Sequence, residues 1–479
     1  MDRQRGALAT NRFGMGARPG EIDAASSDPR GWLLAQIRPE AALLPAGELK
    51  SSRQVLNERA AAYAGRPRPM DMPAPGAMPS GPPSGAPTPE QAKAVRDMVQ
   101  RETRDGLNLE IDARTQHSAQ TTTSFAERWT RFWSNHFTVA ARNPQMIGLV
   151  GPFEREAIRP NAFGSFSALL GAATFHPAML IYLDANRSIG PSTQIAKRRD
   201  AGLNENLARE ILELHTLGVS SGYTQQDIVE LAKALTGWTA GQGPGQGGGQ
   251  GQARMGAAQS GQTLFVEALH EPGARTLLAR TYDGAAEKQA KAMLDDIAAH
   301  PATARHLATK LARHFVADEP PPAAISRLES AFTAGRGDLS ALARAVVELD
   351  EAWLPEARKF KTPEELVVSV SRAAGHDGAF GRDQMRVYQS LGQQPFRAPS
   401  PAGWADTAAT WSGADAIRKR LDWANAVSRR LPRGGTPSGL LESSLGPLAG
   451  ERTRLAVSRA ESVEQGVTLA IMSPEFQRR

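Results

Sequence analysis

Five side chains in three separate stretches of the chain have the chemistry needed to bind a metal or transfer a proton. They are His136, His176, Glu210, Glu213 and His215. Imidazoles and carboxylates act as general acids and bases, and they also bind divalent metals such as Zn, Mn or Fe. We take Glu210, His215 and His136 as candidate catalytic residues and all five as candidate metal ligands. No phosphate loop, dinucleotide glycine pattern or nucleophile elbow adds a cofactor-binding candidate.

The segment from Asn204 to Gly218 carries three of these groups, and its apolar spacing predicts a helix. At ~100° per residue, His215 lies on the apolar face, about 140° from Glu210 and about 200° from Glu213. One straight helix therefore does not bring all three groups to a single ion. The two glutamates form a polar stripe with two interpretations. It is a solvated surface beside Arg209, or a set of ligands or bases if another helix covers it.

His136 lies on the aromatic face of a second predicted helix, which begins with a capping-box pattern at Ser124 to Glu127. This imidazole is either a core histidine bonded to its neighbours or a ligand or acid–base group that points into a cavity. The aromatic residues of the same face are Phe125, Trp129, Phe132 and Trp133.

His176 and His300 each precede a proline, in His176-Pro177 and His300-Pro301. Proline favours the first position of a helix, so each imidazole is expected at a helix start. The repeated arrangement favours a capping role for both. A position facing a cleft is the alternative for His176.

The elements that must position these groups are helices, and we expect a mainly α fold with a multi-helix globular core. The pattern predicts amphipathic helices over 294–315, 322–349, 363–374 and 415–431. A weaker helix start lies at Thr224 to Asp227. Short strands are indicated over 263–266 and 276–278, so we expect a β-hairpin at most, around 263–279.

Two low-complexity stretches divide the chain into five parts. Residues 66–89 are rich in proline and predict an extended linker. Residues 240–262 are mostly Gly, Gln, Ala and Ser, which bury too little apolar area to offset the entropy of ordering, so we expect a disordered loop. The other parts are an N-terminal helical segment (1–65), a helical core with the Asn204–Trp238 motif (90–239) and a C-terminal helical part that packs on the core (263–479).

Composition limits the class of protein. The 479 residues include no cysteine, which excludes disulfides, thiolate metal sites and cysteine nucleophiles. No apolar run approaches the ~18 residues of a membrane span. The first residues lack the apolar core of a signal peptide, so we expect a cytoplasmic chain. The net charge is +6, but basic residues alternate with acids, and we therefore expect no nucleic-acid partner.

Several motifs resemble the bacterial family called domain of unknown function 1800. The resemblance runs in order along nearly the whole chain, and its most specific part is the string from Asn204 to Trp238. It implies a mostly helical fold without a known activity. Many relatives carry export signals, so periplasmic relatives are expected. The other matching segments are Asn11–Gly14, Phe132–Phe137, His176–Leu180, His270, Phe360–Pro363 and Pro401–Trp404.

This sequence departs from the family pattern at three positions. The family often has histidine where this chain has Ser134, and it has Lys and Gly where this chain has Arg275 and Ala279. A site that needs the extra imidazole is therefore not complete here.

Two hypotheses of function follow. The first is an enzyme with an internal His/carboxylate site, in its simplest form a metal-dependent hydrolase that activates water. The second is a non-catalytic helical scaffold that binds a protein partner, in which Glu210 and Glu213 pair with arginines such as Arg209 or Arg128. A glycosidase ranks last, because Glu210 and Glu213 lie on one helix and not on opposite sides of a substrate bond.

Overall fold

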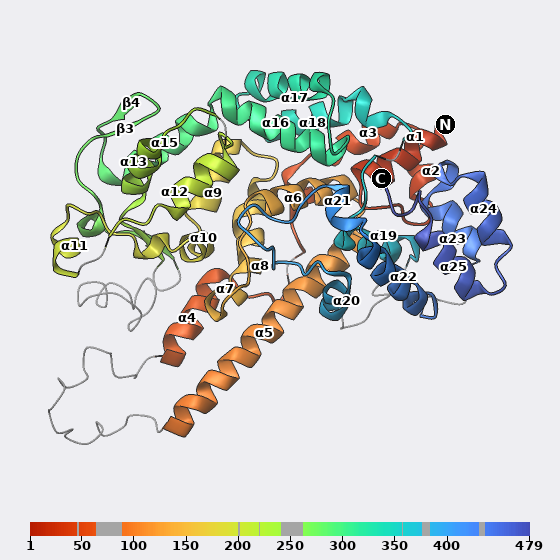
Figure 1. The fold of residues 1–479 in the computed structure, drawn as a ribbon, viewed down its shortest axis with the longest axis horizontal. Helices are drawn as coiled ribbons and strands as arrows, with labels where there is room; N and C mark the ends of the chain where they lie inside the picture. Colours follow the sequence, from red (N-terminus) through yellow and green to blue (C-terminus); the bar gives the residue numbers. More distant parts are fainter. Residues whose placement is uncertain are drawn as a thin grey trace.

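The computed structural model describes residues 1–45, 47–63, 89–199, 202–219, 221–240, 262–356, 358–375, 384–430 and 436–479. Helices form most of this part of the chain, and its sheets are two pairs of short antiparallel strands (Figure 1). The expected mainly α class is confirmed. The predicted Gly/Gln-rich loop lies outside the described residues between 241 and 261, as does the predicted Pro-rich linker up to residue 88.

The N-terminal helices are short except for the fifth, α5, which has 32 residues. In Figure 1, α4 and the N-terminal half of α5 extend away from the rest of the molecule. α1 to α3 pack instead near the C-terminal helices. The bounds are α1 (Arg3–Leu8), α2 (Glu21–Ala25), α3 (Pro29–Leu34), α4 (Ser52–Tyr63) and α5 (Pro89–Gln120).

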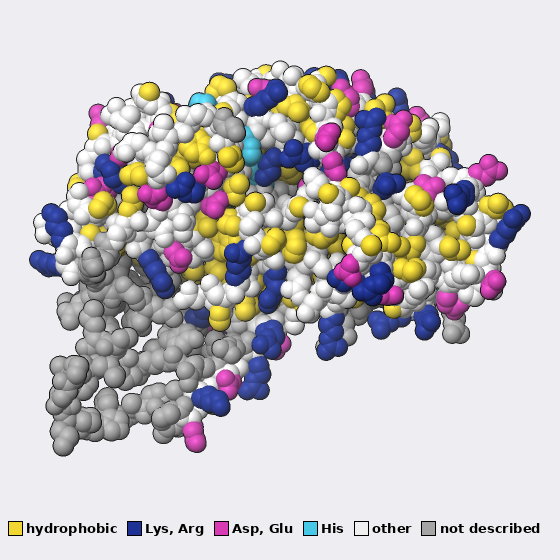
Figure 2. Space-filling model, in the orientation of Figure 1, with side chains coloured by type: hydrophobic (Ala, Val, Ile, Leu, Met, Phe, Trp, Pro, Cys, Tyr) yellow, Lys and Arg dark blue, Asp and Glu magenta, His cyan; other side chains and the backbone are white. Residues whose placement is uncertain are grey.

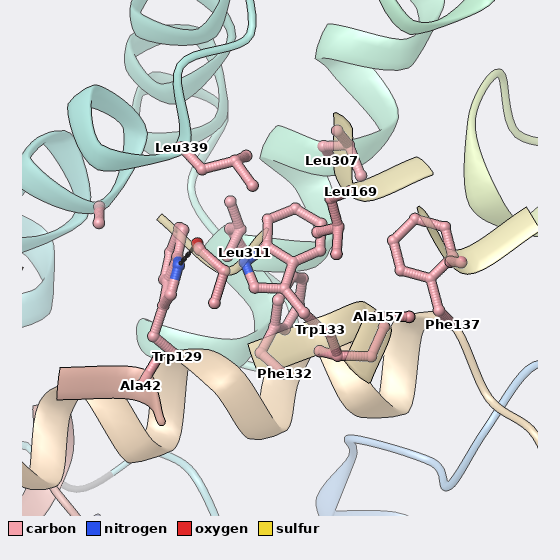
Figure 3. Packing of buried hydrophobic residues seen from close by; sticks show 14 of the residues in the cluster. Ala42, Trp129, Phe132, Trp133, Phe137, Ala157, Leu169, Leu307, Leu311 and Leu339 are labelled. Atoms are coloured by element: carbon pink, nitrogen blue, oxygen red, sulfur yellow. Dashed lines mark hydrogen bonds between the residues drawn. The ribbon is translucent and has the colours of Figure 1, made fainter. Parts of the chain in front are cut away.

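Helix α6 (Ser124–His136) lies at the centre of the apolar core. Its predicted aromatic face is buried, and Trp129 and Trp133 are both inaccessible to solvent. Figure 3 shows these rings packed against side chains that include Leu311. The indole of Trp129 keeps a partner, because its Nε1 donates to the backbone oxygen of Ala162 at 2.7 Å.

The capping box predicted at Ser124 was wrong. Thr123 precedes the helix and makes no side-chain capping bond, and Glu127 turns into the core, where it pairs with Arg159. The Glu127 carboxylate therefore forms an ion pair with Arg159 in the core and does not make the local capping bond. The weaker start at Thr224 does form a full capping box with Asp227.

The helices that follow α6 include the two with a histidine cap. His176 accepts a hydrogen bond from Ala178 N through its Nδ1 at 3.1 Å, and His300 accepts one from Ala302 N at the same distance. The predicted capping role is confirmed for both. The bounds are α7 (Pro144–Ile147), α8 (Val150–Phe153), α9 (Phe166–Thr174), α10 (Pro177–Tyr182), α11 (Gln194–Arg199), α12 (Asn206–Glu210), the π-helical turn η7 (Ile211–His215) and α13 (Gln225–Leu235).

The four strands form two separate ladders. The strands expected over 263–266 and 276–278 are both present, but each pairs with a strand outside 263–279 and not with the other. β1 (Trp238–Ala240) pairs with β2 (Thr263–Phe265), with Thr239 opposite Leu264. β3 (Arg275–Leu277) forms a hairpin with β4 (Arg280–Tyr282).

Two of the predicted long helices are each divided in two. His300 caps a new helix and Pro301 opens it, so residues 294–315 span two helices. Asp338 caps another start through its carboxylate, which divides residues 322–349. The four helices are α15 (Ala286–Ala298), α16 (Pro301–Phe315), α17 (Pro322–Ala334) and α18 (Leu339–Glu348).

The C-terminal helices complete the same core. One cluster of buried apolar side chains runs from Leu8 through Trp133 and Leu311 to Phe476. The boundaries drawn between the predicted parts stay a prediction. The last helices are α19 (Pro363–Ala373), α20 (Gln384–Leu391), α21 (Ala408–Trp411), α22 (Ala414–Ser428), α23 (Pro437–Ser444), α24 (Glu451–Ser458) and α25 (Val463–Met472).

Candidate functional site

Helix α16 carries three basic side chains at intervals of four residues. They are His306, Lys310 and His314. Residues four apart lie on one side of a helix, so the three groups form one stripe. Leu307 and Leu311, which face the apolar core, hold this helix against α6 (Figure 3). The stripe is therefore fixed on a rigid element.

His314 forms a short contact with a carboxylate that lies far away in the sequence. Its Nδ1 is 2.6 Å from Oδ2 of Asp406. An ionised carboxylate only accepts hydrogen bonds, so the proton of the neutral imidazole is on Nδ1 and Nε2 carries a lone pair. That Nε2 is buried and has no hydrogen-bond partner among the described residues. This is the arrangement of a general base with its orienting carboxylate.

The charge of Asp406 is stabilised by its surroundings. Lys359 Nζ lies 3.3 Å from its Oδ1 and 2.5 Å from Oδ1 of Asp318. Burial alone would raise the pKa of Asp406, but the favourable interactions with His314, Lys359 and Arg479 outweigh it and lower the pKa to about 2. Burial lowers the pKa of His314 below its ordinary value, although Asp406 opposes the shift. Neutral imidazole and ionised carboxylate therefore coexist near pH 7.

A cavity of about 380 Å³ lies beside this pair. This volume is within the range of sites for small molecules. In Figure 2 a histidine and several Lys and Arg side chains gather near the middle of the face shown. Five cationic side chains and three carboxylates line the cavity, and this formal excess of positive charge favours an anionic ligand. They are Arg114, Arg128, Arg131, Lys310 and Arg313 against Glu364, Glu365 and Asp406.

Most of these cations are already paired. Arg114 and Arg131 both contact the carboxylate of Glu364, and Arg128 pairs with Glu365. Lys310 differs, since it makes no hydrogen bond or ion pair within 4 Å to any residue that the structure describes. Burial lowers the pKa of Lys310 to about 8, with a smaller opposing effect from Asp406.

Two N–H donors of the cavity wall also lack partners. Nη2 of Arg128 and Nε1 of Trp404 are buried without a hydrogen bond to any described residue. Buried donors are rarely left unpaired in proteins, so each points to a ligand or water. Trp404 is fixed by Asn135, whose side chain accepts from its backbone N at 2.8 Å and donates to its backbone O at 2.9 Å.

A family model matches residues 8–478 of this chain. The chain belongs to the family described as Protein of unknown function (DUF1800). No curated protein and no solved structure matches it. In the described part of this DUF1800 chain, no helix is long and apolar enough to cross a membrane.

The structure brings together two of the predicted site residues, His136 and His215. Their ring centroids are 6.0 Å apart, and Nε2 of His136 donates to the backbone oxygen of His215 at 3.0 Å. The π-helical turn η7 places His215 at the end of its helix. The free nitrogens are Nδ1 of His136 and Nε2 of His215, both buried and without partners among the described residues.

His306 joins these two imidazoles to form a histidine cluster near Lys310. Its centroid lies 6.3 Å from that of His136. Burial, followed by the charge of Lys310, lowers the pKa of His215 to about 3 and that of His306 to about 4. The pKa of His136 is well below its ordinary value for the same two reasons. All three rings are therefore neutral near pH 7.

His176 has local partners at the start of α10. Besides its capping bond, its Nε2 lies 3.0 Å from Oε2 of Glu156. The same carboxylate accepts from Ser52 Oγ at 2.6 Å. His176 is not part of the lining of the cavity beside His314.

Glu210 and Glu213 lie on the partly exposed side of α12 and η7. Glu213 pairs with Arg209 at 3.4 Å, the partner that the scaffold hypothesis gave it, and its side chain is 28% exposed. Glu210 has no such partner among the described residues, and burial together with the charge of Glu213 raises its pKa. Neither glutamate lines the cavity.

The described residues of this DUF1800 chain contain no group of three or more His, Asp or Glu side chains placed to hold one metal ion. The metal-ligand assignments to His136, His176, His215, Glu210 and Glu213 therefore stay predictions. The expected divalent metal also remains a prediction.

Sequence reasoning missed Lys310, His314 and Asp406. A signal for the first two was present, because His306, Lys310 and His314 repeat at helical spacing within the predicted helix 294–315. Asp406 follows the motif Pro401–Trp404 by two residues, but nothing in its spacing indicates its partner on α16.

Proposed function

We propose that this chain is an enzyme that carries out acid–base chemistry on a small anionic substrate in the cavity. The observation that supports it most is the partly buried pair of His314 and Asp406, in which His314 lines a cavity rich in cations and its Nε2 has no partner among the described residues. His314 is the general base. It removes a proton from the substrate, or from a water molecule beside it, and Asp406 stabilises the imidazolium that forms.

The cations of the wall give the site its specificity. Arg128 Nη2 and Trp404 Nε1 are free to donate to an anionic group. The unpaired Lys310 adds positive potential where negative charge develops during proton transfer. A neutral analogue of the substrate would leave these donors and this charge uncompensated, and would bind more weakly.

The proposal is tested by binding and turnover with matched variants. Thermal unfolding in the presence of small carboxylates and phosphates identifies anions that raise the Tm. Compounds that keep one free carboxylate or phosphate group and also carry an ester, an amide or an acidic C–H bond then form the substrate panel. We expect His314→Gln to lose turnover by about 100-fold or more while it retains anion binding. Trp404→Phe, which removes the N–H donor and keeps an aromatic ring of smaller size, weakens binding. A wild-type protein that binds none of these anions would refute the proposal.

A second form of the enzyme hypothesis is a metal-dependent hydrolase. The free nitrogens of His136 and His215 on neighbouring rings support it, because neutral imidazole nitrogens bind Zn, Mn or Fe. Glu210, Glu213 and His176 are the further ligands proposed from the sequence. One observation favours the scaffold hypothesis, namely the ion pair between Glu213 and Arg209.

A further inference from the structure

We propose that Lys310 forms a covalent imine with the carbonyl group of its substrate, and that the substrate is a small oxo acid. This inference rests on the proposed function, because it uses the same cavity and the same general base. It adds a nucleophile, which the His314–Asp406 pair lacks, and it names the class of substrate.

The position of Lys310 separates it from the other lysines near the cavity. It lines the cavity and has no ionic partner within 4 Å among the described residues, whereas Lys359 nearby is held by Asp318 and Asp406. Lys310 is partly buried. A lysine that is partly desolvated next to other cationic groups and without a carboxylate partner loses its proton more easily and becomes a nucleophilic amine.

The groups around Lys310 come from several elements. On its own helix lie His306, Arg313 and His314. The charge of Lys310 acts on His136 of α6 and on His215 of η7, and Asp406 is the acid that acts on the charge of Lys310. The only acid in this set is paired with His314 and Lys359. Partial burial and the charge of Arg313 therefore favour the neutral amine, and Asp406, which opposes them, is shared with His314 and Lys359.

The covalent step balances without a further reagent. The lone pair of Lys310 Nζ attacks the carbonyl carbon and forms a C–N bond. The carbonyl oxygen takes up both N–H protons and leaves as water, which gives a C=N bond. His314 Nε2 relays these protons, and its lone pair can then remove a proton from the carbon next to the imine, where the imine nitrogen accepts the electrons.

The carboxylate of the oxo acid matches the remaining donors. Arg128 and Trp404 line the cavity, and their Nη2 and Nε1 atoms have no partners among the described residues. A carboxylate accepts hydrogen bonds from such donors. A cavity of about 380 Å³ holds a small oxo acid with room for a side chain.

The test is reductive trapping on the full chain. The protein is incubated with pyruvate, 2-oxoglutarate or glyoxylate and cyanoborohydride, and peptide mass spectrometry locates the secondary amine. We expect one adduct, on Lys310, that an excess of a non-carbonyl carboxylate such as lactate suppresses. Lys310→Arg keeps the charge and gives no adduct there, and Lys310→Met guards against a folding defect of the arginine.

Lys361 provides a matched internal control. It is fully buried, its Nζ has no hydrogen-bond partner among the described residues, and burial lowers its pKa to about 7. It does not line the cavity. Labelling of Lys361 or of exposed lysines at the same rate as Lys310 would overturn the imine. If lactate and pyruvate stabilise the protein equally and no adduct forms, the imine is refuted and the anion site stands. If neither ligand binds, both proposals fall.

Discussion

His314 and Asp406 are 92 positions apart in the chain, and their partly buried side chains meet at 2.6 Å. Each is positioned by other contacts. His314 lies on α16 next to Phe132, with ring centroids 5.4 Å apart, and Asp406 is held by Lys359. Because the histidine proton lies on the side of the carboxylate, the opposite nitrogen is the one available for chemistry.

Replacing Asp406 by Asn tests this tautomer directly. The amide can accept from or donate to the imidazole, so the fixed preference for a proton on Nδ1 is lost. We expect the imidazole nitrogen signals of His314 in ¹⁵N NMR to change from one tautomer to a mixture, with His314→Gln used to assign them. Turnover of any substrate found falls by about 100-fold or more. Unchanged nitrogen shifts in Asp406→Asn would show that the carboxylate does not orient the ring.

Replacing Lys310 by Met tests the unpaired cation through stability. The pKa of Lys310 is about 8 in the folded protein against an ordinary value of 10.5. Below pH 8 the folded state bears a partly buried charge. Between pH 8 and pH 10.5 the unfolded state binds more protons, so wild-type stability rises with pH. We expect Lys310→Met to raise the free energy of unfolding at neutral pH by about 1–3 kcal/mol, a gain that disappears above about pH 10.5. Urea denaturation of both proteins across this pH range measures the difference in unfolding free energy. A Lys310→Met protein that is less stable than the wild type at neutral pH would contradict the prediction.

The sequence predicted the helices well where local patterns decide them. The prolines after His176 and His300, the capping box at Thr224 and the aromatic face of α6 depend on neighbours only a few residues away. The helix predicted over 294–315 did not take into account the start expected at His300, and the break at Asp338 was overlooked, since a short capping sequence interrupts a pattern that otherwise continues.

The candidate site was predicted only in part, for a physical reason. His136 and His215 were chosen because each lies on an apolar helix face, and the core brings these faces together. The π-helical turn η7 changes the direction of side chains from Ile211 to His215, which a straight-helix wheel cannot anticipate. Asp406 reaches His314 only through tertiary packing of a segment without regular structure, and one sequence alone does not encode that pairing in any spacing.

Elemental analysis of the purified protein tests the metal hypothesis. If His136 and His215 share an ion through their free nitrogens, the wild type contains about one equivalent of Zn, Mn or Fe per chain, and His215→Ala contains none. His176→Ala is the companion variant. Since His176 pairs with Glu156 away from the cavity, retention of metal by this variant would remove it from the ligand set. A metal-free wild type would exclude the metal-dependent hydrolase and leave the proposal for His314 in place.

The histidine cluster makes the protein sensitive to mild acid. His215 and His306 have pKa values of about 3 and about 4 when folded, against an ordinary 6.5, and that of His136 is also depressed. Below about pH 6.5 the unfolded chain binds protons that the folded state does not, so stability falls as pH falls. Three such groups give a slope of up to about 4 kcal/mol per pH unit. Urea denaturation between about pH 7 and about pH 5 measures the slope, and His306→Asn should reduce it by about a third. An identical slope in the variant would show that His306 is already protonated or exposed.

Glu127 and Glu213 are matched glutamates on two helices that differ in burial. The Glu127 side chain is fully buried, accepts a hydrogen bond from Ser118 Oγ at 2.7 Å and lies 2.8 Å from Arg159. Burial raises its pKa, but the charge of Arg159 is the largest of the effects that keep the pKa well below its ordinary value. Glu127→Gln leaves buried guanidinium charge without compensation, and we expect it to cost about 3 kcal/mol of unfolding free energy. Glu213→Gln breaks a partly exposed pair with Arg209 and should change stability by less than about 0.5 kcal/mol. Equal effects in the two variants would mean that the ionic cluster around Glu127 is not a structural element of the core. A large cost for Glu213→Gln would instead indicate that the surface of α12 and η7 is covered by a partner.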